Sequence, residues 1–227
     1  MSMDIIKVKD LTKEYRFGET TVKALNGVNM NVVQKSLMSF VGSSGSGKTT
    51  LLNMIGGLDR PSSGQVEMDG INLSSSPENE LHKIRRSKVG FIFQHFYLIP
   101  TLTAFENILV PTIPIRGQAF EERAKNLLSY VSMEKRQNHR PSQLSGGEQQ
   151  RVAICRALIN EPEVLLCDEI TGELDTETGE QILRLLKKIN QERGTTILLV
   201  THDEKIAANS DRTVTLSDGR IVSDKTN

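Results

Sequence analysis

The stretch GSSGSGKTT at residues 42–50 decides the fold. It follows a short apolar segment, SLMSFV, and precedes a segment whose apolar residues Leu51, Leu52 and Ile55 recur at helical spacing. The pattern G-x-x-x-x-G-K-[ST] between a strand and a helix is typical of a phosphate-binding P-loop. A flexible glycine-serine segment would explain the glycines, but not the lysine, the hydroxyl and both flanking elements. The stretch therefore predicts the core of an α/β P-loop NTPase.

The residues of this loop have separate expected roles in binding a nucleotide. Glycines let the backbone curl so that its N–H groups point at phosphate oxygens, and the helix start adds the positive end of its dipole. Lys48 should reach the β- and γ-phosphates and act in catalysis, and the Thr49 hydroxyl should coordinate Mg²⁺. We expect the whole loop to contact the phosphates: Gly42, Ser43, Ser44, Gly45, Ser46, Gly47, Lys48, Thr49 and Thr50.

Two other short apolar segments also end in polar side chains. The segment EVLLCDE, residues 163–169, ends in Asp168 and Glu169, and TTILLVTHD, residues 195–203, has His202 after its apolar run. Strands separated by helices form parallel sheets, which place ligands at the carboxyl ends of their strands. We therefore expect Asp168 to hold Mg²⁺ through water, Glu169 to orient and deprotonate the attacking water, and His202 to lie near the γ-phosphate.

The rest of the chain is expected to form a single domain, residues 1–227, around this site. Residues 1–40 alternate in strand fashion, which favours an N-terminal antiparallel β subdomain beside the parallel sheet. The stretch 98–117 carries three prolines and helical patterns follow it, and we interpret residues 98–158 as a mainly helical lobe. This lobe would be inserted in a nucleotide-binding core made of residues 1–97 and 159–227.

The composition limits the partners and the location of the protein. Lysine plus arginine equals aspartate plus glutamate, 28 each, so nothing favours a nucleic-acid partner, whose binders usually carry a basic surplus. Cys155 and Cys167 form no CxxC pair and indicate neither a disulfide framework nor a zinc site. No apolar stretch approaches the roughly 20 residues of a membrane helix, and the N-terminus has no signal-peptide pattern. We expect a cytosolic protein.

The stretch LSGGEQQR, residues 144–151, offers a second anion site, because a serine hydroxyl and glycine N–H groups open a helical segment. One nucleotide cannot use both sites of one chain if the P-loop, Asp168 and Glu169 already enclose its phosphates from one side. The economical arrangement is a head-to-tail pair of chains, related by a two-fold axis, that encloses two nucleotides. Each γ-phosphate would then touch Ser145 and Gly147 of the other chain. A plain capped helix would explain the serine but not the double glycine.

The six stretches GSSGSGKTT, FIFQHF, LSGGEQQR, VLLCDE, ELD and VTHD occur in an order and spacing that resembles the ATPase subunit of ABC transporters. The resemblance covers nearly the whole chain and implies ATP and Mg²⁺ as ligands. It implies that Gln94 touches Mg²⁺ and the attacking water, that His202 contacts the γ-phosphate, and that Asp175 crosses between subunits. It also implies nucleotide contacts from the signature residues Ser145, Gly146, Gly147 and Glu148.

Three details around these motifs leave alternatives open. Tyr15 resembles the aromatic residue that stacks on adenine in this family, but it could also be a strand aromatic that covers the core. After the two carboxylates the family commonly has proline and then Thr-Gly-Asn-Leu-Asp, whereas this chain has Ile170, and Glu173 replaces the asparagine. Neither change touches a catalytic group, so the ATPase prediction stands, while dimer stability and turnover stay open. Both cysteines fall where related sequences often have alanine, and we interpret them as packing residues.

The resemblance implies an ATP-gated homodimeric clamp that drives separate membrane permease subunits. The protein would then lie in the cytoplasm, peripheral on the inner face of the cell membrane, with the lobe near residues 95–115 as docking surface. The flanking sequences look closest to the lipoprotein-release and macrolide-export branch. The alternatives are a soluble ABC ATPase acting on DNA or ribosomes, and a regulatory relative acting through a membrane partner. A GTPase is disfavoured because no N-K-x-D-type segment is present.

Overall fold

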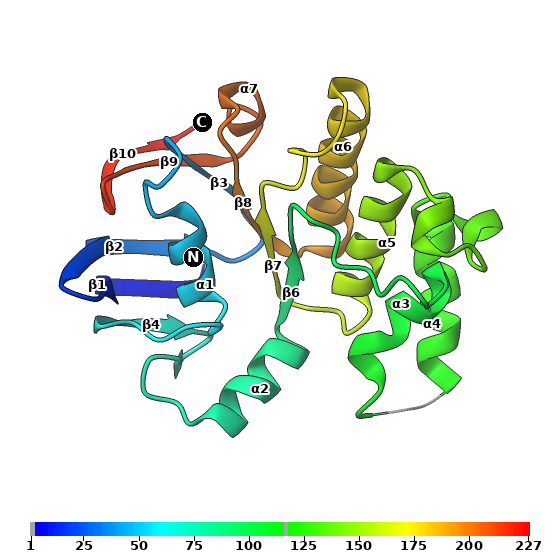
Figure 1. The fold of residues 1–227 in the computed structure, drawn as a ribbon, viewed down its shortest axis with the longest axis horizontal. Coiled ribbons are helices and arrows are strands. Elements are labelled where there is room, and N and C mark those ends of the chain that lie inside the picture. Colours follow the sequence, from blue (N-terminus) through cyan, green and yellow to red (C-terminus); the bar gives the residue numbers. More distant parts are fainter. Residues whose placement is uncertain (1–2, 116–117) are drawn as a thin grey trace.

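The computed structural model describes residues 3–115 and 118–227 (Figure 1). Residues 1–2 and 116–117, which fall inside the predicted domain and the predicted lobe, lie outside the described residues. The described chain forms a central parallel sheet with an antiparallel sheet on one side and a group of helices on the other (Figure 1).

The central sheet has the strand order β10-β9-β3-β8-β7-β6. Its inner strands pair in parallel, and β10 closes one edge by pairing antiparallel with β9. The strands are β3 (Leu37–Val41), β6 (Val89–Ile92), β7 (Val164–Asp168), β8 (Thr196–Val200), β9 (Arg212–Ser217) and β10 (Arg220–Thr226). The short helix α7 (Glu204–Ala207) lies between β8 and β9. This order places β3, β8 and β7 side by side, so their carboxyl ends share one edge.

Alternate side chains of the central sheet enter two separate hydrophobic cores. Leu166 of β7 belongs to the core that also contains the buried apolar residues of α1 (Lys48–Ile55) and of the antiparallel sheet. Leu165 and Cys167 of the same strand belong to the core formed with α5 (Gly146–Leu158) and α6 (Thr176–Arg193). Because a strand turns successive side chains to opposite faces, both faces of the sheet are covered. This explains why these strands read as continuous apolar runs.

The antiparallel sheet has the order β2-β1-β4-β5 and confirms the predicted N-terminal antiparallel β subdomain. Its strands are β1 (Asp4–Phe17), β2 (Thr20–Val33), β4 (Ser63–Met68) and β5 (Ile71–Asn72). The Arg212 guanidinium of β9 donates to the backbone oxygen of Asn31 in β2 at 2.7 Å, which joins the two sheets. Helix α2 (Glu78–Ser87) then leads into β6 and buries only Leu81 and Ile84.

The helical subdomain lies between β6 and β7, as predicted for an inserted lobe (Figure 1). It contains α3 (Ala104–Leu109), the 3₁₀ turns Val110–Thr112, Glu134–Arg136 and Pro141–Gln143, α4 (Gln118–Tyr130) and α5. Helix α3 begins with a capping box in which the Thr103 side chain accepts from the Glu106 N–H at 3.2 Å. Such caps satisfy backbone donors that would otherwise lack partners. No described helix of the chain is both long and apolar enough to cross a bilayer.

Candidate nucleotide site

The residues predicted to bind phosphate gather at the carboxyl ends of three neighbouring strands. The P-loop follows β3, Asp168 ends β7, and Thr201 and His202 follow β8. These strands are adjacent in the order β3-β8-β7. The convergence expected from a parallel sheet is therefore present, although the three segments are far apart in the sequence.

The P-loop backbone needs glycine at two positions because neighbouring backbone comes very close. A Cβ on Gly42 would lie 2.2 Å from the backbone oxygen of Leu216 in β9. A Cβ on Gly47 would lie 2.4 Å from the backbone oxygen of Ala24 in β2, and Gly47 has φ 103°, a left-handed conformation that favours glycine. The loop is thus wedged between the two sheets, with helix α1 beginning directly after it.

Lys48 is buried beneath the loop, with 5% of its surface exposed. Its ammonium group donates to the backbone oxygens of Gly42 at 2.9 Å and Ser43 at 2.8 Å, and lies 3.4 Å from the Ser46 hydroxyl. A buried ammonium without acceptors would be very unfavourable, so the loop carbonyls stabilise its charge. The positive charge is therefore already in place at the point where phosphates would approach.

Thr49 and Asp168 place two oxygen-bearing side chains next to this lysine. The Thr49 hydroxyl donates to the Asp168 carboxylate at 3.0 Å. Burial raises the pKa of Asp168, and the neighbouring Glu169 charge adds to this effect, against the opposing effects of Thr49 and Lys48. Hydroxyl and carboxylate oxygens suit Mg²⁺, which is usually bound by one or two protein groups together with substrate phosphates. The described residues contain no cluster of three or more histidine, cysteine or acidic side chains that would suit another metal centre.

Glu169 and His202 face one another beside Thr49 and Asp168. The His202 Nδ1 lies 3.4 Å from a Glu169 carboxylate oxygen, and the His202 side chain is largely exposed. Glu169 adopts φ 46°, an unfavourable conformation for a residue with a side chain, and its N–H donates to the Val200 backbone oxygen at 3.0 Å. The following residue, Ile170, is buried, so apolar packing holds this turn where related sequences commonly have proline. The carboxylate is thus held at the edge where the γ-phosphate would end.

Tyr15 lies half-buried on β1 beside the start of α1. Its hydroxyl donates to the Asp59 carboxylate at 3.0 Å, and the Lys13 ammonium lies 4.9 Å from the centre of its ring. Burial raises the pKa of Tyr15, the Asp59 carboxylate raises it further, and a hydrogen bond with Thr50 lowers it. The contact with Thr50 places the ring near the end of the P-loop, which agrees with a position for an adenine base. Stacking on adenine stays a prediction.

Gln94 lies where the segment after β6 meets the loop after β7. A Cβ on Gly172 would lie 3.0 Å from the Gln94 amide nitrogen and 3.2 Å from the Glu169 backbone oxygen, so Gln94 packs against the loop that follows the carboxylates. The Arg156 guanidinium of α5 donates to the backbone oxygens of Phe96 at 2.7 Å and Tyr97 at 2.5 Å. These contacts connect the segment that contains Gln94 with both the core and the helical subdomain, while the contacts of Gln94 with Mg²⁺ and the attacking water stay predictions.

The signature residues open helix α5. Ser145 caps the helix by accepting from the Glu148 N–H at 3.2 Å, while the Glu148 carboxylate accepts from the Ser145 N–H at 2.9 Å. Gly147 is required by space, because a Cβ there would lie 2.4 Å from the Thr178 methyl group. Among the described residues, no hydrogen bond or ion pair joins Ser145–Glu148 to the P-loop. Within one chain the two predicted anion sites therefore stay apart.

Asp175 has a local role that the sequence did not reveal. It caps helix α6, because its carboxylate accepts from the Thr178 hydroxyl at 2.6 Å and from the Thr178 N–H at 2.9 Å. These two hydrogen bonds keep the pKa of Asp175 below its usual range. The cap fixes the loop that carries Asp175, and the predicted crossing between subunits stays a prediction.

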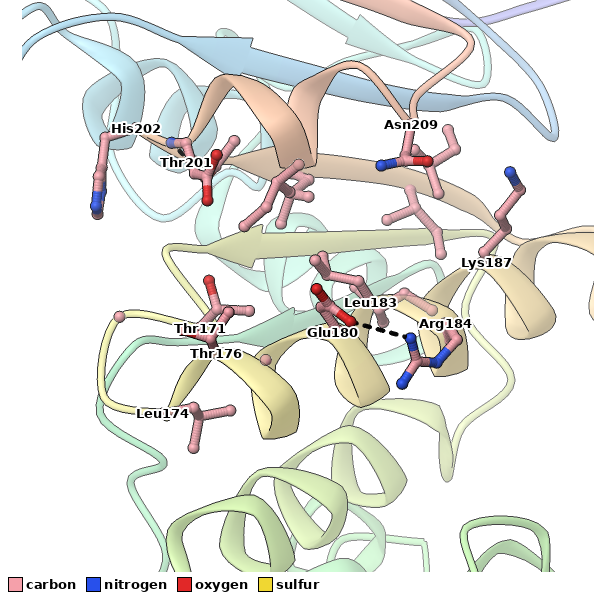
Figure 2. Close-up of a pocket in the computed structure, with 18 of the residues that line it drawn as sticks. Thr171, Leu174, Thr176, Glu180, Leu183, Arg184, Lys187, Thr201, His202 and Asn209 are labelled. Atoms are coloured by element: carbon pink, nitrogen blue, oxygen red, sulfur yellow. Dashed lines mark hydrogen bonds and ion pairs between the residues drawn. The ribbon is translucent and has the colours of Figure 1, made fainter.

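A cavity of about 780 Å³ adjoins this site on the side of His202 and Asp175. Figure 2 shows His202 and Thr201 on one side of the cavity and Thr171, Leu174 and Thr176 on the other. It extends between α6 and α7, and none of the P-loop residues lines it. The cavity therefore borders the predicted phosphate-binding edge without including the P-loop.

Sequence reasoning missed one contact close to the site. The His95 Nδ1 contacts a carboxylate oxygen of Glu173, with the two side chains 65% and 35% exposed. His95 directly follows Gln94, and Glu173 lies two residues before Asp175. No periodicity links positions so far apart, although Glu173 departs from the common pattern of the family.

Comparisons with known proteins agree with this geometry. The family described as "ABC transporter" matches residues 25–172. The chain is 48% identical over 223 residues to "Uncharacterized ABC transporter ATP-binding protein MJ0796" of Methanocaldococcus jannaschii, covering 96% of this chain and 95% of that protein. It is 43% identical over 222 residues to "Lipoprotein-releasing system ATP-binding protein LolD" of Geobacter metallireducens, covering 97% and 99%.

Longer relatives and solved structures also match. The chain is 44% identical over 225 residues to "Macrolide export ATP-binding/permease protein MacB" of Rhodopirellula baltica, covering 97% of this chain but only 33% of that protein. A structure described as a dimeric post-hydrolysis state of the cassette MJ0796 bound to ADP and Pi has a TM-score of 0.90 at 45% identity, covering 97% and 98% of the two chains. The structure of cbiO1 from Clostridium perfringens has a TM-score of 0.87 at 30% identity, covering 98% and 88%.

Proposed function

The chain belongs to the ABC transporter family of ATP-binding proteins, and on that premise we propose that it is the ATP-binding and ATP-hydrolysing subunit of an ABC transporter. It would act as a homodimeric clamp that closes on ATP and drives separate membrane permease subunits. The observation that carries this proposal is the meeting of Lys48, Thr49, Asp168, Glu169 and His202 at one sheet edge. These are the groups that binding and cleaving a nucleoside triphosphate requires.

The nucleotide would lie across the P-loop with its phosphates over the start of α1. The backbone N–H groups and Lys48 would bind the phosphate oxygens, and Tyr15 would stack on the adenine. Thr49, Gln94 and, through water, Asp168 would hold Mg²⁺, which when bound supplies positive charge at the phosphate oxygens. The remaining loop residues contribute backbone contacts, as the close packing of Gly42 and Gly47 supports.

Hydrolysis would proceed by attack of water on the γ-phosphorus. The Glu169 carboxylate would orient this water and accept its proton as the new P–O bond forms and the bond to the ADP oxygen breaks. His202 would contact the γ-phosphate from the neighbouring strand end, which its position 3.4 Å from Glu169 supports. Lys48 would stabilise the negative charge that shifts toward the leaving oxygen.

Dimerisation would complete each site. The start of α5, with Ser145, Gly146, Gly147 and Glu148, does not reach the P-loop of its own chain and would contact the γ-phosphate bound by the other chain. The relative MJ0796 at 45% identity has been solved as a dimer with ADP and Pi, which supports this arrangement. ATP would then bridge the two chains, and its hydrolysis would release them.

The permease would dock in a groove between the core and the helical subdomain. This groove, about 520 Å³, is lined by Arg85, Phe93, Tyr97, Val110 and Arg156 together with neighbouring residues. Tyr97 is 63% exposed, and the predicted docking surface near residues 95–115 forms one of its walls. Such an exposed apolar surface with a cationic rim suits a partner protein segment. The protein would accordingly lie on the cytoplasmic face of the membrane.

Within the family, we favour the lipoprotein-release and macrolide-export branch. The LolD relative has nearly the same length as this chain, whereas the chain spans about a third of the MacB relative, which combines ATPase and permease in one polypeptide. A soluble ABC ATPase with a non-transport partner is the alternative, and no feature of the described residues favours it. The transported substrate and its direction are not specified by the site.

The test is light scattering after gel filtration of Glu169→Gln, with and without ATP and Mg²⁺. Removing the base should leave ATP binding intact, nearly abolish hydrolysis and trap an ATP-dependent dimer. Glu161→Gln changes an exposed carboxylate far from the site, paired with Arg123, and should behave like the parent protein. Full ATP turnover by Glu169→Gln would contradict the role of Glu169, and a protein that never hydrolyses ATP would contradict the proposed function.

A further inference from the structure

Three loops of different origin meet beside the predicted active site. Gln94 packs against Gly172, and the Phe96 ring lies 3.8 Å from the position of a Cβ on Gly146. Leu174 lies 3.3 Å from the same position. The segment after β6, the loop after β7 and the start of α5 therefore touch one another within a few residues.

Glu173 introduces a negative charge into this junction. Its backbone oxygen lies 3.9 Å from the position of a Cβ on Gly146, so its side chain begins within reach of the first turn of α5. That turn already holds one carboxylate, Glu148, which accepts from the Ser145 N–H and contacts the Arg136 guanidinium at 2.9 Å. A helix start attracts carboxylates because of its free N–H groups and its dipole. A second carboxylate there would occupy the surface that a phosphate requires.

His95, in the segment after β6, contacts the Glu173 carboxylate. The imidazole Nδ1 contacts Glu173 directly, and the His95 ring lies 6.1 Å from the Tyr97 ring in an edge-on arrangement. The pair connects the segments after β6 and after β7, unlike the exposed pair of His82 and Glu78, which lies within helix α2 at 3.5 Å. The contact of His95 with Glu173 therefore restrains the Glu173 side chain at the junction of two segments, whereas the contact of His82 with Glu78 stays within one helix.

We propose that His95 is a positioning residue that keeps the Glu173 carboxylate away from the start of α5, so that Ser145–Gly147 stay free for the nucleotide bound by the partner subunit. The inference rests on the proposed function, because it assumes the ATP-bridged dimer. The His95 contact would compensate for Glu173, a residue that departs from the common family pattern. Without His95, Glu173 competes with the γ-phosphate for the N–H groups of α5.

The experiment titrates ATP, with Mg²⁺, into Glu169→Gln protein and follows dimer formation by light scattering. Adding His95→Ala should raise the ATP concentration at half-maximal dimerisation about two- to fivefold, the range expected for one exposed ion pair. Adding Glu173→Ala as well should restore the parent midpoint, because the competing carboxylate is gone. His95→Gln keeps a donor for Glu173 and should also stay near the parent midpoint. His82→Ala, which breaks the matched pair on α2, should change nothing.

ATP binding to the separate subunits provides a second readout. Calorimetry at protein concentrations below dimerisation should give the same ATP affinity for the parent and for His95→Ala, because the P-loop is unaffected. A simple structural defect would lower both binding and dimerisation and would not be corrected by Glu173→Ala. An unchanged midpoint in His95→Ala, or a midpoint that Glu173→Ala fails to restore, overturns the inference. If the Glu169→Gln parent binds ATP but forms no dimer, the clamp mechanism itself is overturned. This result is obtained before His95 is changed, so the two failures are distinguishable.

Discussion

Replacing Lys48 by methionine should separate nucleotide binding from fold stability. Methionine keeps most of the aliphatic stem, which is buried, but removes the ammonium group that donates to the Gly42 and Ser43 carbonyls. Ser43 is exposed and Gly42 is half-buried, so water can satisfy both oxygens in the variant. The variant also avoids the desolvation penalty of a buried ammonium, which offsets the lost hydrogen bonds, so the free energy of unfolding should fall by no more than about 1 kcal/mol.

The loss of ATP affinity should be much larger than the loss of stability. A hydrogen bond that involves a charged group contributes about 1.5–3 kcal/mol, and the ammonium faces phosphate oxygens that carry full charges. Since each 1.4 kcal/mol is a factor of ten, the dissociation constant for ATP should rise about 10- to 150-fold. Isothermal titration calorimetry with ATP and Mg²⁺ measures this change, and urea unfolding measures the stability.

Lys88→Met is the matched control for Lys48→Met. Lys88 is also partly buried and contacts Asp69 and Glu163, but it lies at the start of β6, away from the P-loop. This variant should lose stability and keep its ATP affinity. A dissociation constant within twofold of the parent in Lys48→Met would refute the assignment of the ammonium to the phosphates. Equal losses of affinity in both variants would show that the effect follows from stability instead.

Three further experiments test the packing and the charges. Gly56→Ala should lower the free energy of unfolding, measured by urea unfolding, by about 1–3 kcal/mol, because the new methyl carbon would lie 2.3 Å from a ring carbon of Phe91. Burial raises the pKa of Cys155 to about 12 and that of Cys167 well above its usual range. A thiol reagent at neutral pH should therefore label neither cysteine until the protein unfolds. Rapid labelling of the native protein would contradict their burial. Arg212 lowers the pKa of Asp224, so their ion pair stabilises the fold fully above the unfolded pKa of the carboxyl, and this stabilisation is lost as pH falls through the lowered pKa. The destabilisation caused by Asp224→Asn should therefore become smaller in acid. A difference in unfolding free energy between variant and parent that stays constant across pH would refute this.

The P-loop and its neighbours could be predicted because local sequence determines them. The residues GSSGSGKT are typical of a turn between a strand and a helix start, and the runs VLLC and ILLV have the short length and apolar composition of buried strands. Since parallel strands share one carboxyl edge, Asp168 and His202 could be placed near the loop without any measured distance. The cysteines could likewise be assigned to packing, and both are buried.

Contacts through space could not be predicted in the same way. The interaction of His95 with Glu173 joins positions from two separate connections, and neither residue belongs to a periodic pattern. Helix α2 is mostly polar and exposes most of its surface, so its weak apolar stripe gave no prediction. Asp175 was noted for a role between subunits, while its capping of α6 depends on backbone geometry that only the folded chain defines.

The order in which the chain leaves the ribosome has a consequence for when it can first hold a ligand. The P-loop is made early, but both strands that pair with β3 come late, at residues 196–200 and 212–217. Gly42 packs against the Leu216 backbone, and the Gly219 N–H donates to the Ser46 backbone oxygen at 3.1 Å. A chain cut short before these residues would carry an intact P-loop sequence without the walls that shape it. Such a fragment should bind no nucleotide and should expose unpaired apolar strands, which would direct it to chaperones and proteases rather than to a membrane partner.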